Sequence, residues 1–383
     1  MQYVDFGKTG VKVSRLGMGV MRLPNKDVDG KSVPDEEKSI ALLQRAVELG
    51  VNYFDSAPYY CDSQSEPILG KAVKGMRDKV YISTKNPLEN SNGDDFEKRL
   101  EKSLKNLQTD YIDFYHFWGI SLNAYNNSVM AEDGPMARAR KLKEQGVIKH
   151  ISFSYHDRDA GAKEGGNLEE LLRRSDGLLE SLLCQYNIMD RNKESGIALA
   201  HKMGLGTVVM GPVGGGLLAA PLPAIQALLP ANVRSSAEIA LRFVFSNQNI
   251  NIALSGMSNI GQLEENAAIA SNTQELTQAE RSQIEDVMKE NERLAELYCT
   301  GCRYCMPCPN GINIPAIFGF MNYHRVHKLT DHAKGMYGQI GKVPWFKFEN
   351  ASKCTECGAC EKKCPQAIPI IAQLKETHAV LAG

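Results

Sequence analysis

The sequence has no excess of charge of either sign, and this absence limits its possible partners. It contains 44 lysine and arginine residues against 45 aspartate and glutamate residues, so the formal net charge at pH 7 is −1. A protein that binds nucleic acid through its phosphates generally carries a basic surface, and the composition shows no such bias. We therefore expect no nucleic-acid partner.

Long apolar segments are absent as well. No apolar run in the sequence approaches the roughly 20 residues that a membrane-spanning helix needs. The first residues, Met1 to Phe6, lack the basic start and apolar centre of a secretory signal peptide. We therefore expect no membrane partner and a location in the cytoplasm.

Cysteine is nearly absent from most of the chain. Of the ten cysteines, only Cys61 and Cys184 precede Tyr298, and the other eight form two tight groups after it. A disulfide-stabilised protein is usually small and spreads its cysteines along the chain, so this distribution argues against disulfides. Closely spaced Cys-x-x-Cys pairs in an intracellular enzyme indicate bound metal instead.

The chain does contain, up to about residue 270, short apolar runs that alternate with helix-length segments. Three of the predicted helices are Glu36–Glu48, Asp95–Leu107 and Ser236–Phe245. The apolar runs are rich in Val, Ile, Tyr and Phe, as strands buried on both faces tend to be. They predict strands at Leu16–Met21, Val51–Asp55, Lys79–Lys85, Tyr111–Phe117, Ile148–Ser154, Leu182–Tyr186, Thr207–Met210 and Asn251–Ser255.

Eight strands that alternate with helices over this length predict an α/β fold, the (β/α)8 TIM barrel. A doubly wound open sheet is the alternative. It is disfavoured because no Gly-x-Gly-x-x-Gly follows the first strand.

The character of the sequence changes after Leu276. Thr277-Gln-Ala-Glu280 has the pattern of a capping box, and the helix that it begins has apolar residues on one face. We interpret this helix as the one that closes the barrel domain or links it to the next. The 383 residues therefore predict two domains, a barrel over residues 1–290 and a second domain over residues 291–383.

The cysteines of the second domain have the spacing of iron–sulfur ligands. The two groups are Cys299-x-x-Cys302-x-x-Cys305-x-x-Cys308-Pro and Cys354-x-x-Cys357-x-x-Cys360-x-x-x-Cys364-Pro. Two-residue gaps let three thiolates of one loop bind three corners of a [4Fe–4S] cubane, and a fourth ligand followed by proline comes from the other group. We assign one cluster to Cys299, Cys302, Cys305 and Cys364, and the other cluster to Cys354, Cys357, Cys360 and Cys308.

These groups predict a small, mainly helical, ferredoxin-like dicluster domain. The alternative is two structural zinc sites, because Cys-x-x-Cys pairs also make tetrahedral sites with four cysteine ligands. Zinc sites need two pairs with a longer gap between them, and the stepped spacing that ends in Cys-Pro favours iron–sulfur clusters.

Candidate catalytic residues lie where barrel enzymes carry them, at the carboxyl ends of the strands. Asp55 ends one predicted strand, Tyr60 follows it five residues later, and Lys85 ends the next strand. A lysine in a barrel mouth needs a carboxylate partner, because an unpaired buried charge is costly. A phenol beside that ammonium would have a lowered pKa and would donate a proton near neutral pH. We add His116, on the following strand, to these candidates.

Several motifs resemble those of aldo-keto reductases. Phe54-Asp-Ser-Ala-Pro-Tyr-Tyr60 resembles the Asp…Tyr signature of the family, and Ser83-Thr-Lys85 resembles the strand with its catalytic lysine. Further similar segments are Gly7–Gly10, Val13–Gly17, Tyr111–Tyr115, Gln185–Asn187, Pro212–Gly216, Ser255–Asn259 and Gln262–Asn266. The resemblance covers residues 1 to about 270, and the subgroup with a C-terminal domain for two [4Fe–4S] clusters resembles the whole chain.

The resemblance implies hydride transfer between NADP or NAD and a small carbonyl or alcohol substrate. Tyr60 would be the general acid, Lys85 would lower its pKa, and Asp55 would hold Lys85 in place. Glycines in the cofactor loops would let backbone N–H groups approach phosphate oxygens. The implied dinucleotide-binding residues are Ser154, Gln185, Pro212, Gly214, Gly215, Gly216, Gly256, Ser258, Gln262, Glu265 and Asn266.

The match to the family is weakest on the nicotinamide side. Trp118 stands where the family usually has a histidine, and His116 lies two residues earlier on the same face of the strand. The Ser-Asn pair after the fifth strand reads Ser154-Tyr155-His156, and Met210 replaces an aromatic residue. Ser258 replaces an arginine that often binds the 2′-phosphate, so NAD and NADP both stay open.

Three hypotheses for the clusters follow from these features. In the first, a nicotinamide-dependent reductase or dehydrogenase exchanges electrons through its clusters with an electron-transfer protein partner. Because a hydride carries two electrons and a cluster normally carries one, this coupling needs a converter such as flavin, for which the sequence shows no motif. In the second, the clusters only stabilise the domain. In the third, the chain is an electron-transfer iron–sulfur protein whose barrel is a binding scaffold with weak or no carbonyl reductase activity.

Overall fold

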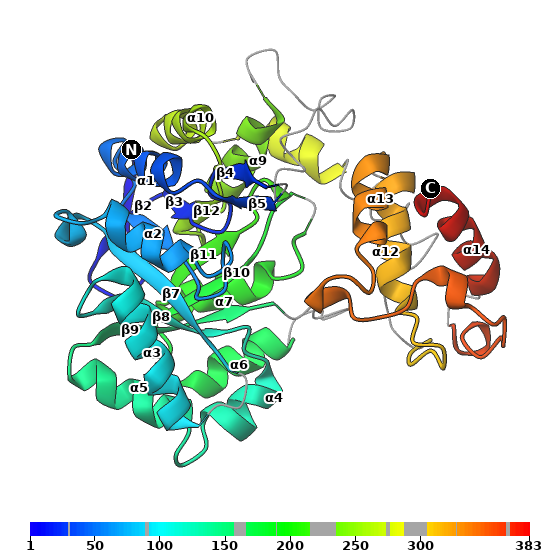
Figure 1. The fold of residues 1–383 in the computed structure, drawn as a ribbon, viewed down its shortest axis with the longest axis horizontal. Helices are drawn as coiled ribbons and strands as arrows, with labels where there is room; N and C mark the ends of the chain where they lie inside the picture. Colours follow the sequence, from blue (N-terminus) through cyan, green and yellow to red (C-terminus); the bar gives the residue numbers. More distant parts are fainter. Residues whose placement is uncertain are drawn as a thin grey trace. The chain divides into compact units, whose positions relative to one another are not determined.

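The structure is a computed structural model of the chain. It describes residues 1–29, 31–88, 92–156, 166–188, 190–214, 235–272, 276–286, 305–326, 328–364 and 368–383. The chain divides into two compact units (Figure 1): one contains the described residues up to Leu276, and the other contains those from Thr277 onward.

Eight parallel strands of the first unit close into a barrel in the order β10-β11-β12-β3-β6-β7-β8-β9. The predicted (β/α)8 TIM barrel is therefore confirmed, and every strand begins and ends within two residues of its predicted bounds. The strands are β3 Leu16–Gly19, β6 Tyr53–Asp55, β7 Tyr81–Pro87, β8 Ile112–Trp118, β9 Ile148–Tyr155, β10 Ser181–Gln185, β11 Gly206–Met210 and β12 Ile252–Ser255.

Helices surround the barrel strands (Figure 1), and several begin at side-chain caps. Asp35 accepts a hydrogen bond from the backbone N–H of Lys38 at the start of α1, and Asn92 accepts one from Asp95 at the start of α3. Helices α1 and α9 have the bounds that the periodicity predicts. The helical elements are α1 Glu36–Glu48, α2 Ser65–Ala72, η1 Arg77–Lys79, α3 Gly93–Leu107, α4 Leu122–Ala124, η2 Tyr125–Val129, α5 Pro135–Glu144, α6 Asn167–Ser175, α7 Glu194–Met203, α9 Ser236–Phe245 and α10 Ile260–Ser271.

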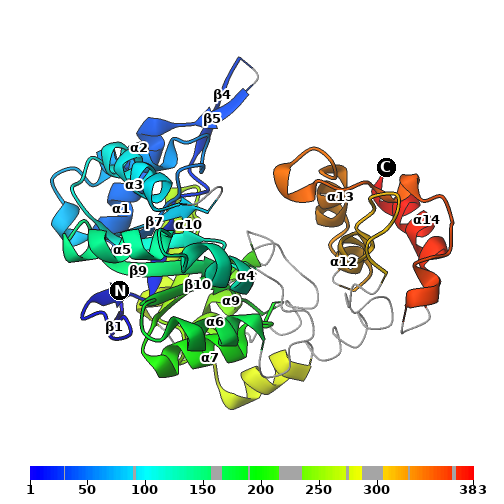
Figure 2. The ribbon, with the colours of Figure 1, turned by 90° about the horizontal axis from the view of Figure 1, so that it is seen from below.

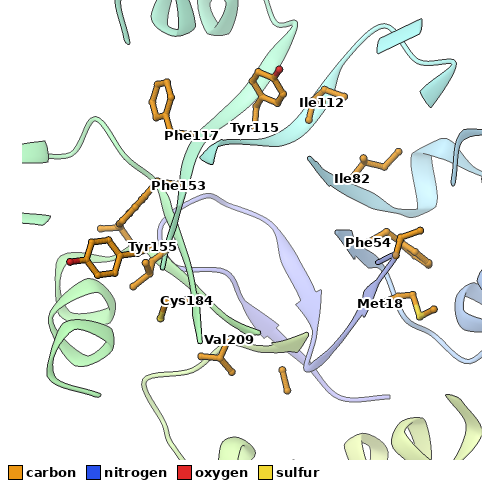
Figure 3. Packing of buried hydrophobic residues seen from close by; sticks show 14 of the residues in the cluster. Met18, Phe54, Ile82, Ile112, Tyr115, Phe117, Phe153, Tyr155, Cys184 and Val209 are labelled. Atoms are coloured by element: carbon orange, nitrogen blue, oxygen red, sulfur yellow. The ribbon is translucent and has the colours of Figure 1, made fainter. Parts of the chain in front are cut away.

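The core of the barrel unit has two layers. On the outer side, Phe54, Ile82, Phe153 and Val209 point away from the barrel axis toward the helices (Figure 3). The inner layer fills the barrel itself and consists of the buried residues Phe6, Val13, Tyr53, Phe114, Leu183, Val208, Ile252 and Leu254. The barrel is thus closed below by packed side chains, and only its carboxyl end is left for chemistry.

Two antiparallel hairpins are added to the barrel. The strands β1 Tyr3–Asp5 and β2 Lys12–Ser14 pair with each other, and the adjoining Phe6 and Val13 pack into the inner layer. The strands β4 Asn25–Val28 and β5 Lys31–Pro34 form the second hairpin, which projects from the barrel in Figure 2.

The second unit has its own apolar core and is mainly helical, as predicted. The helix that begins after Thr277 is capped as expected, since Thr277 and Glu280 exchange side-chain to backbone hydrogen bonds. The boundary near residue 290 stays a prediction. The elements are α12 Ile314–Arg325, α13 Thr330–Gly338, η4 Pro344–Phe346, η5 Ala351–Lys353, η6 Glu361–Lys363 and α14 Ile370–Leu381. The core includes Ile312, Ile317, Phe318, Met321, Tyr337 and Leu374.

None of the helices in the described segments combines the length and the apolarity that crossing a bilayer requires.

Candidate active site and cluster site

An ion pair lies at the carboxyl end of the barrel. Asp55 is the last residue of β6, and Lys85 is on the neighbouring β7. Nζ of Lys85 is 2.5 Å from Oδ1 of Asp55 and donates a second hydrogen bond of 2.7 Å to the backbone oxygen of Ser56, while Ser83 donates to Oδ2 of Asp55 at 2.7 Å. Burial disfavours the ammonium, but Asp55 and Tyr60 outweigh it and raise the pKa of Lys85. Lys85 therefore has the carboxylate partner that its position demands.

Tyr60 lies against this ion pair, in the loop after β6. Nζ of Lys85 is 4.9 Å from the centre of the Tyr60 ring, and the phenol and the ammonium interact electrostatically. Burial raises the pKa of Tyr60 by more than Lys85 lowers it. Our expectation of a lowered pKa is therefore wrong in sign, because the loss of hydration around the phenol outweighs one neighbouring cation.

Aromatic side chains shield the phenol. Trp118, the last residue of β8, packs edge-on against Tyr60, with ring centres 5.7 Å apart and planes at 85°. Tyr59 also contacts Trp118, at 5.6 Å between ring centres. Trp118 thus occupies the rim position where the family usually has a histidine, and it contributes to the burial of Tyr60.

His116 lies in the barrel interior. It pairs with Lys85 in the ladder between β7 and β8, and its side chain is fully buried. Neither ring nitrogen has a hydrogen-bond partner of normal geometry in the part of the chain that is described. Burial lowers the pKa of His116 to about 4; Asp55 opposes this shift, and the backbone of Phe153 opposes it only weakly. The structure therefore brings His116 to the ion pair but away from the surface of the mouth, and a catalytic role for it stays a prediction.

Two residues that the sequence reasoning did not select lie at the same mouth. His156 directly follows β9, and its Cδ2 is 3.5 Å from the point where a Cβ would stand on Gly119, just after β8. Its pKa is lowered to about 4, first by burial and then by the positive charges of Lys85 and Lys193. Because His156 is exposed, the loss of hydration lowers its pKa by less than it lowers the pKa of the buried His116. Lys193, before α7, is only 3% exposed.

A signal for His156 was present in the sequence, and one for Lys193 was not. Alternation from Ser152 and Ser154 places His156 on the inward face of the strand. Lys193 follows Arg191-Asn192 and looks like an ordinary solvated loop charge, so only the structure shows that it is buried.

The predicted nicotinamide-side residues lie at strand ends around the mouth. Oγ of Ser154 accepts a hydrogen bond of 2.9 Å from the backbone N–H of Gly119, and Nε2 of Gln185 donates to Asp190 at 2.7 Å. Asn187 donates to the backbone oxygen of Gly211 at 2.9 Å. These bonds fix the loops that follow β8, β10 and β11.

The predicted phosphate-side residues lie after β11 and β12. Pro212 is buried, and Gly214 has φ of 58°, a conformation that favours glycine. Gly215 and Gly216 lie outside the described residues. Gly256, directly after β12, leaves room for Arg22, because a Cβ there would be 3.3 Å from Cδ of Arg22.

Helix α10 follows this segment. Asn259 caps it by accepting a hydrogen bond of 2.9 Å from the N–H of Gln262, whose Oε1 accepts from the N–H of Ser258 at 2.9 Å. Asn266 donates to Oγ of Ser255 at 3.2 Å, and Glu265 accepts from Ser235 at 2.7 Å. A capped helix start beside Arg22 suits a phosphate, which backbone N–H groups and the helix dipole stabilise.

Five cysteines of the second unit line one cavity. Four of them, Cys308, Cys354, Cys357 and Cys360, are the set that the spacing assigns to one cluster. The fifth is Cys305, which the spacing assigns to the other cluster, and Lys363 also lines the cavity. Cys364 is described, whereas Cys299 and Cys302 lie outside the described residues. Among residues with described positions, no three Cys, His, Asp or Glu side chains converge to hold a single metal ion. Thiols spread around a cavity fit a cubane, because each thiolate binds a different iron corner.

The fold, the ion pair and the cysteine-lined cavity together are those of an oxidoreductase barrel with an iron–sulfur domain, and comparison with known families agrees. The model of the aldo/keto reductase family matches residues 15–289, and that of the 4Fe-4S dicluster domain matches residues 298–368. The chain belongs to the aldo/keto reductase family and has a C-terminal 4Fe-4S dicluster domain.

Similar proteins cover the barrel unit. L-galactose dehydrogenase of Arabidopsis thaliana is 27% identical over 315 residues, which are 75% of this chain and 94% of that protein. Methylglyoxal reductase YeaE of Escherichia coli is 27% identical over 248 residues, 63% of this chain and 81% of that protein. The holo form of aldo-keto reductase AKR11C1 from Bacillus halodurans superimposes with a TM-score of 0.62 at 27% identity, covering 75% of this chain and 96% of that chain.

Proposed function

We propose that the protein transfers a hydride between NAD(P)H and a small carbonyl or alcohol substrate at the mouth of the barrel. The observation that carries this proposal is the buried Lys85–Asp55 pair, 2.5 Å between Nζ and Oδ1, against the ring of Tyr60. A fixed positive charge beside a phenol supports a group that must lose and regain a proton. Of the two relatives described above, one is named a dehydrogenase and the other a reductase, which supports reaction in either direction.

Each residue has a distinct role in this proposal. Tyr60 donates its proton to the carbonyl oxygen, and its raised pKa keeps the phenol in the protonated form at neutral pH. Lys85 stabilises the phenolate that remains, and Asp55 holds Lys85 in position. A bound nicotinamide supplies the hydride that the carbonyl carbon receives. In alcohol oxidation the proton moves the other way, from the substrate hydroxyl to the phenolate.

The dinucleotide would lie across the carboxyl ends of β9 to β12. Ser154 and Gln185 would contact the nicotinamide end, and Pro212 and Gly214 to Gly216 would hold the phosphates. Gly256, Ser258, Gln262, Glu265 and Asn266 would bind the adenosine end at the start of α10. Arg22 adds a cation beside Gly256, which compensates for the arginine missing at Ser258 and leaves NADP and NAD both compatible with the site.

The test is the oxidation of NAD(P)H by a panel of aldehydes and ketones, with anaerobically reconstituted protein. We expect turnover by the wild type and a loss of about 10²-fold or more in Tyr60→Phe, because a positioned acid contributes on that order. Dinucleotide affinity, followed by fluorescence, should not change. The proposal fails if no carbonyl is turned over, or if Tyr60→Phe reacts like the wild type.

The cysteines would hold two [4Fe–4S] clusters that exchange electrons with a protein partner. Cys299, Cys302, Cys305 and Cys364 would bind one cluster, and Cys308, Cys354, Cys357 and Cys360 the other. Cys357 is exposed, so the second cluster would lie where a partner can approach. Absorption and EPR spectra of anaerobic protein, before and after NADPH, test this. Eight irons per chain and a reduced-cluster signal are expected, and the absence of cluster absorption would contradict it.

An electron-transfer protein with a catalytically weak barrel is the second candidate. It is favoured by Trp118 in the place of a histidine and by the burial of His116, which leave the nicotinamide side unlike the family pattern. It predicts tight NAD(P)H binding without hydride transfer to any carbonyl, together with rapid reduction of the clusters by a partner.

A further inference from the structure

Lys193 is a buried cation for which the described residues supply no counter-ion. The residue is 3% exposed, yet no carboxylate among the described residues forms an ion pair with it. Asp190, the nearest acidic residue before it in the loop, instead accepts hydrogen bonds from Gln185 and from the N–H of Asn192. An ammonium in a side chain this buried keeps little contact with water, and without an ion-pair partner among the described residues it is expected where a ligand brings the opposite charge.

Lys193 lies on the same face of the barrel as the Lys85–Asp55 pair. It lies between β10 and α7, in a loop at the carboxyl face of the barrel, and β10 pairs with β9, which ends just before His156. His156 feels the positive charge of both Lys193 and Lys85. One imidazole thus interacts electrostatically with both ammonium groups, as expected for residues that follow neighbouring strands at one face of the barrel.

We propose that the substrate is a carbonyl compound with an anionic group, a carboxylate in the simplest case, which binds Lys193 while the carbonyl oxygen binds Tyr60. This proposal rests on the proposed function and names its substrate class. His156 interacts electrostatically with both lysines, and as a neutral imidazole it would offer an N–H donor to the same substrate without repelling it or adding a further charge.

The anion belongs to the substrate rather than to the dinucleotide. The dinucleotide phosphates would have their own groups, namely the start of α10 after β12 and Arg22 in the loop after β3. Lys193 follows β10, two strands away from β12 around the barrel. Binding at Lys193 should therefore discriminate between carbonyl compounds and not between dinucleotides.

The experiment compares 4-carboxybenzaldehyde with its neutral methyl ester, methyl 4-formylbenzoate, as two aldehydes of similar shape. Binding is measured by calorimetry on the full holoprotein without reduced dinucleotide, so that no hydride transfer is needed for the readout. We expect the acid to bind about tenfold or more tightly than the ester, as a charge-assisted hydrogen bond implies. Lys193→Met should abolish this preference and Lys193→Arg should retain most of it.

Lys202→Met is the matched control, because it removes an exposed charge from the same helix, α7. It should leave the preference intact. Lys193→Met should keep or raise the melting temperature, since an apolar side chain of similar shape replaces an unpaired buried charge. Equal binding of acid and ester by the wild type overturns the proposal, and so does a loss of NADPH affinity in Lys193→Met. If acid binding depends on Lys193 but Tyr60→Phe still turns over, only the proposed function fails.

Discussion

Nζ of Lys85 and Oδ1 of Asp55 lie 2.5 Å apart inside the barrel, with their side chains 1% and 3% exposed. Removing one member of such a pair leaves the other charge buried and alone, which typically costs about 3–5 kcal/mol. We expect Asp55→Asn to lower the free energy of unfolding by this order, measured by urea denaturation. Asp55→Asn with Lys85→Met should recover much of it, because no charge then remains.

A surface pair provides the control. Lys12 and Asp5 are 3.7 Å apart, with side chains 73% and 77% exposed. Asp5→Asn should change the unfolding free energy by less than about 1 kcal/mol, as exposed pairs do. If Asp55→Asn and Asp5→Asn lowered the free energy of unfolding equally, the Lys85–Asp55 pair would not be the buried ion pair described above.

His116 should make the barrel sensitive to acid. Its pKa is about 4 in the folded chain because of burial, below its ordinary value of 6.5. Below pH 6.5 His116 binds a proton in the unfolded chain but not in the folded chain, so the free energy of unfolding falls as the pH drops toward 4. Between about pH 7.5 and about pH 5.5 this amounts to about 1 kcal/mol for one such histidine.

His116→Leu should reduce that dependence to the part that His156 contributes, because the pKa of His156 is lowered as well, and the variant should be at least as stable as the wild type near neutral pH. Leucine has no nitrogen to leave unsatisfied, whereas both nitrogens of His116 lack a normal partner in the described structure. Urea denaturation at the two pH values gives the difference. An unchanged pH dependence in His116→Leu would assign the acid sensitivity to other groups.

The strand and cysteine patterns were accessible from the sequence because each rests on local spacing. Glu36–Glu48 and Ser236–Phe245 matched α1 and α9, since apolar periodicity and capping residues define them. Asp55 and Lys85 could be paired because they were predicted to end two neighbouring strands; β7 in fact continues to Pro87. The direction of the pKa of Tyr60 could not be predicted, because it is the net of burial by Trp118 and attraction by Lys85. The burial of Lys193 could not be predicted either, because it depends on which segments pack over the loop in three dimensions.

Cys357→Ser should separate the clusters from the barrel chemistry. Cys357 is exposed and lines the cavity with Cys308, Cys354 and Cys360, so the serine variant loses a cluster ligand with little loss of packing. We expect iron per chain to fall from about eight to about four, as loss of one cubane requires. Carbonyl-dependent oxidation of NAD(P)H should persist, while electron transfer to a protein acceptor should decline.

Cys61→Ser is the control for this variant, because Cys61 belongs to the barrel unit and its Sγ contacts the backbone oxygen of Met21 at 3.4 Å. It should retain both the iron and the acceptor reduction. If Cys357→Ser instead unfolds cooperatively at a much lower temperature and its folded fraction keeps all electron-transfer activity, the clusters are structural.

Trp118 should set the alkaline limit of carbonyl reduction. The reaction uses the protonated phenol of Tyr60, so kcat/KM is present below its pKa and is lost as the pH rises through it. Burial raises this pKa above its ordinary value of 10.0, and Trp118 contributes to that burial. Trp118→Ala hydrates the phenol while Lys85 stays beside it. The alkaline loss of kcat/KM should therefore move to lower pH than in the wild type.

Trp345→Ala, which removes a tryptophan that is 68% exposed in the second unit, should leave the profile in place. An identical alkaline limit in Trp118→Ala and the wild type would mean that another group, and not the Tyr60 phenol, supplies the proton.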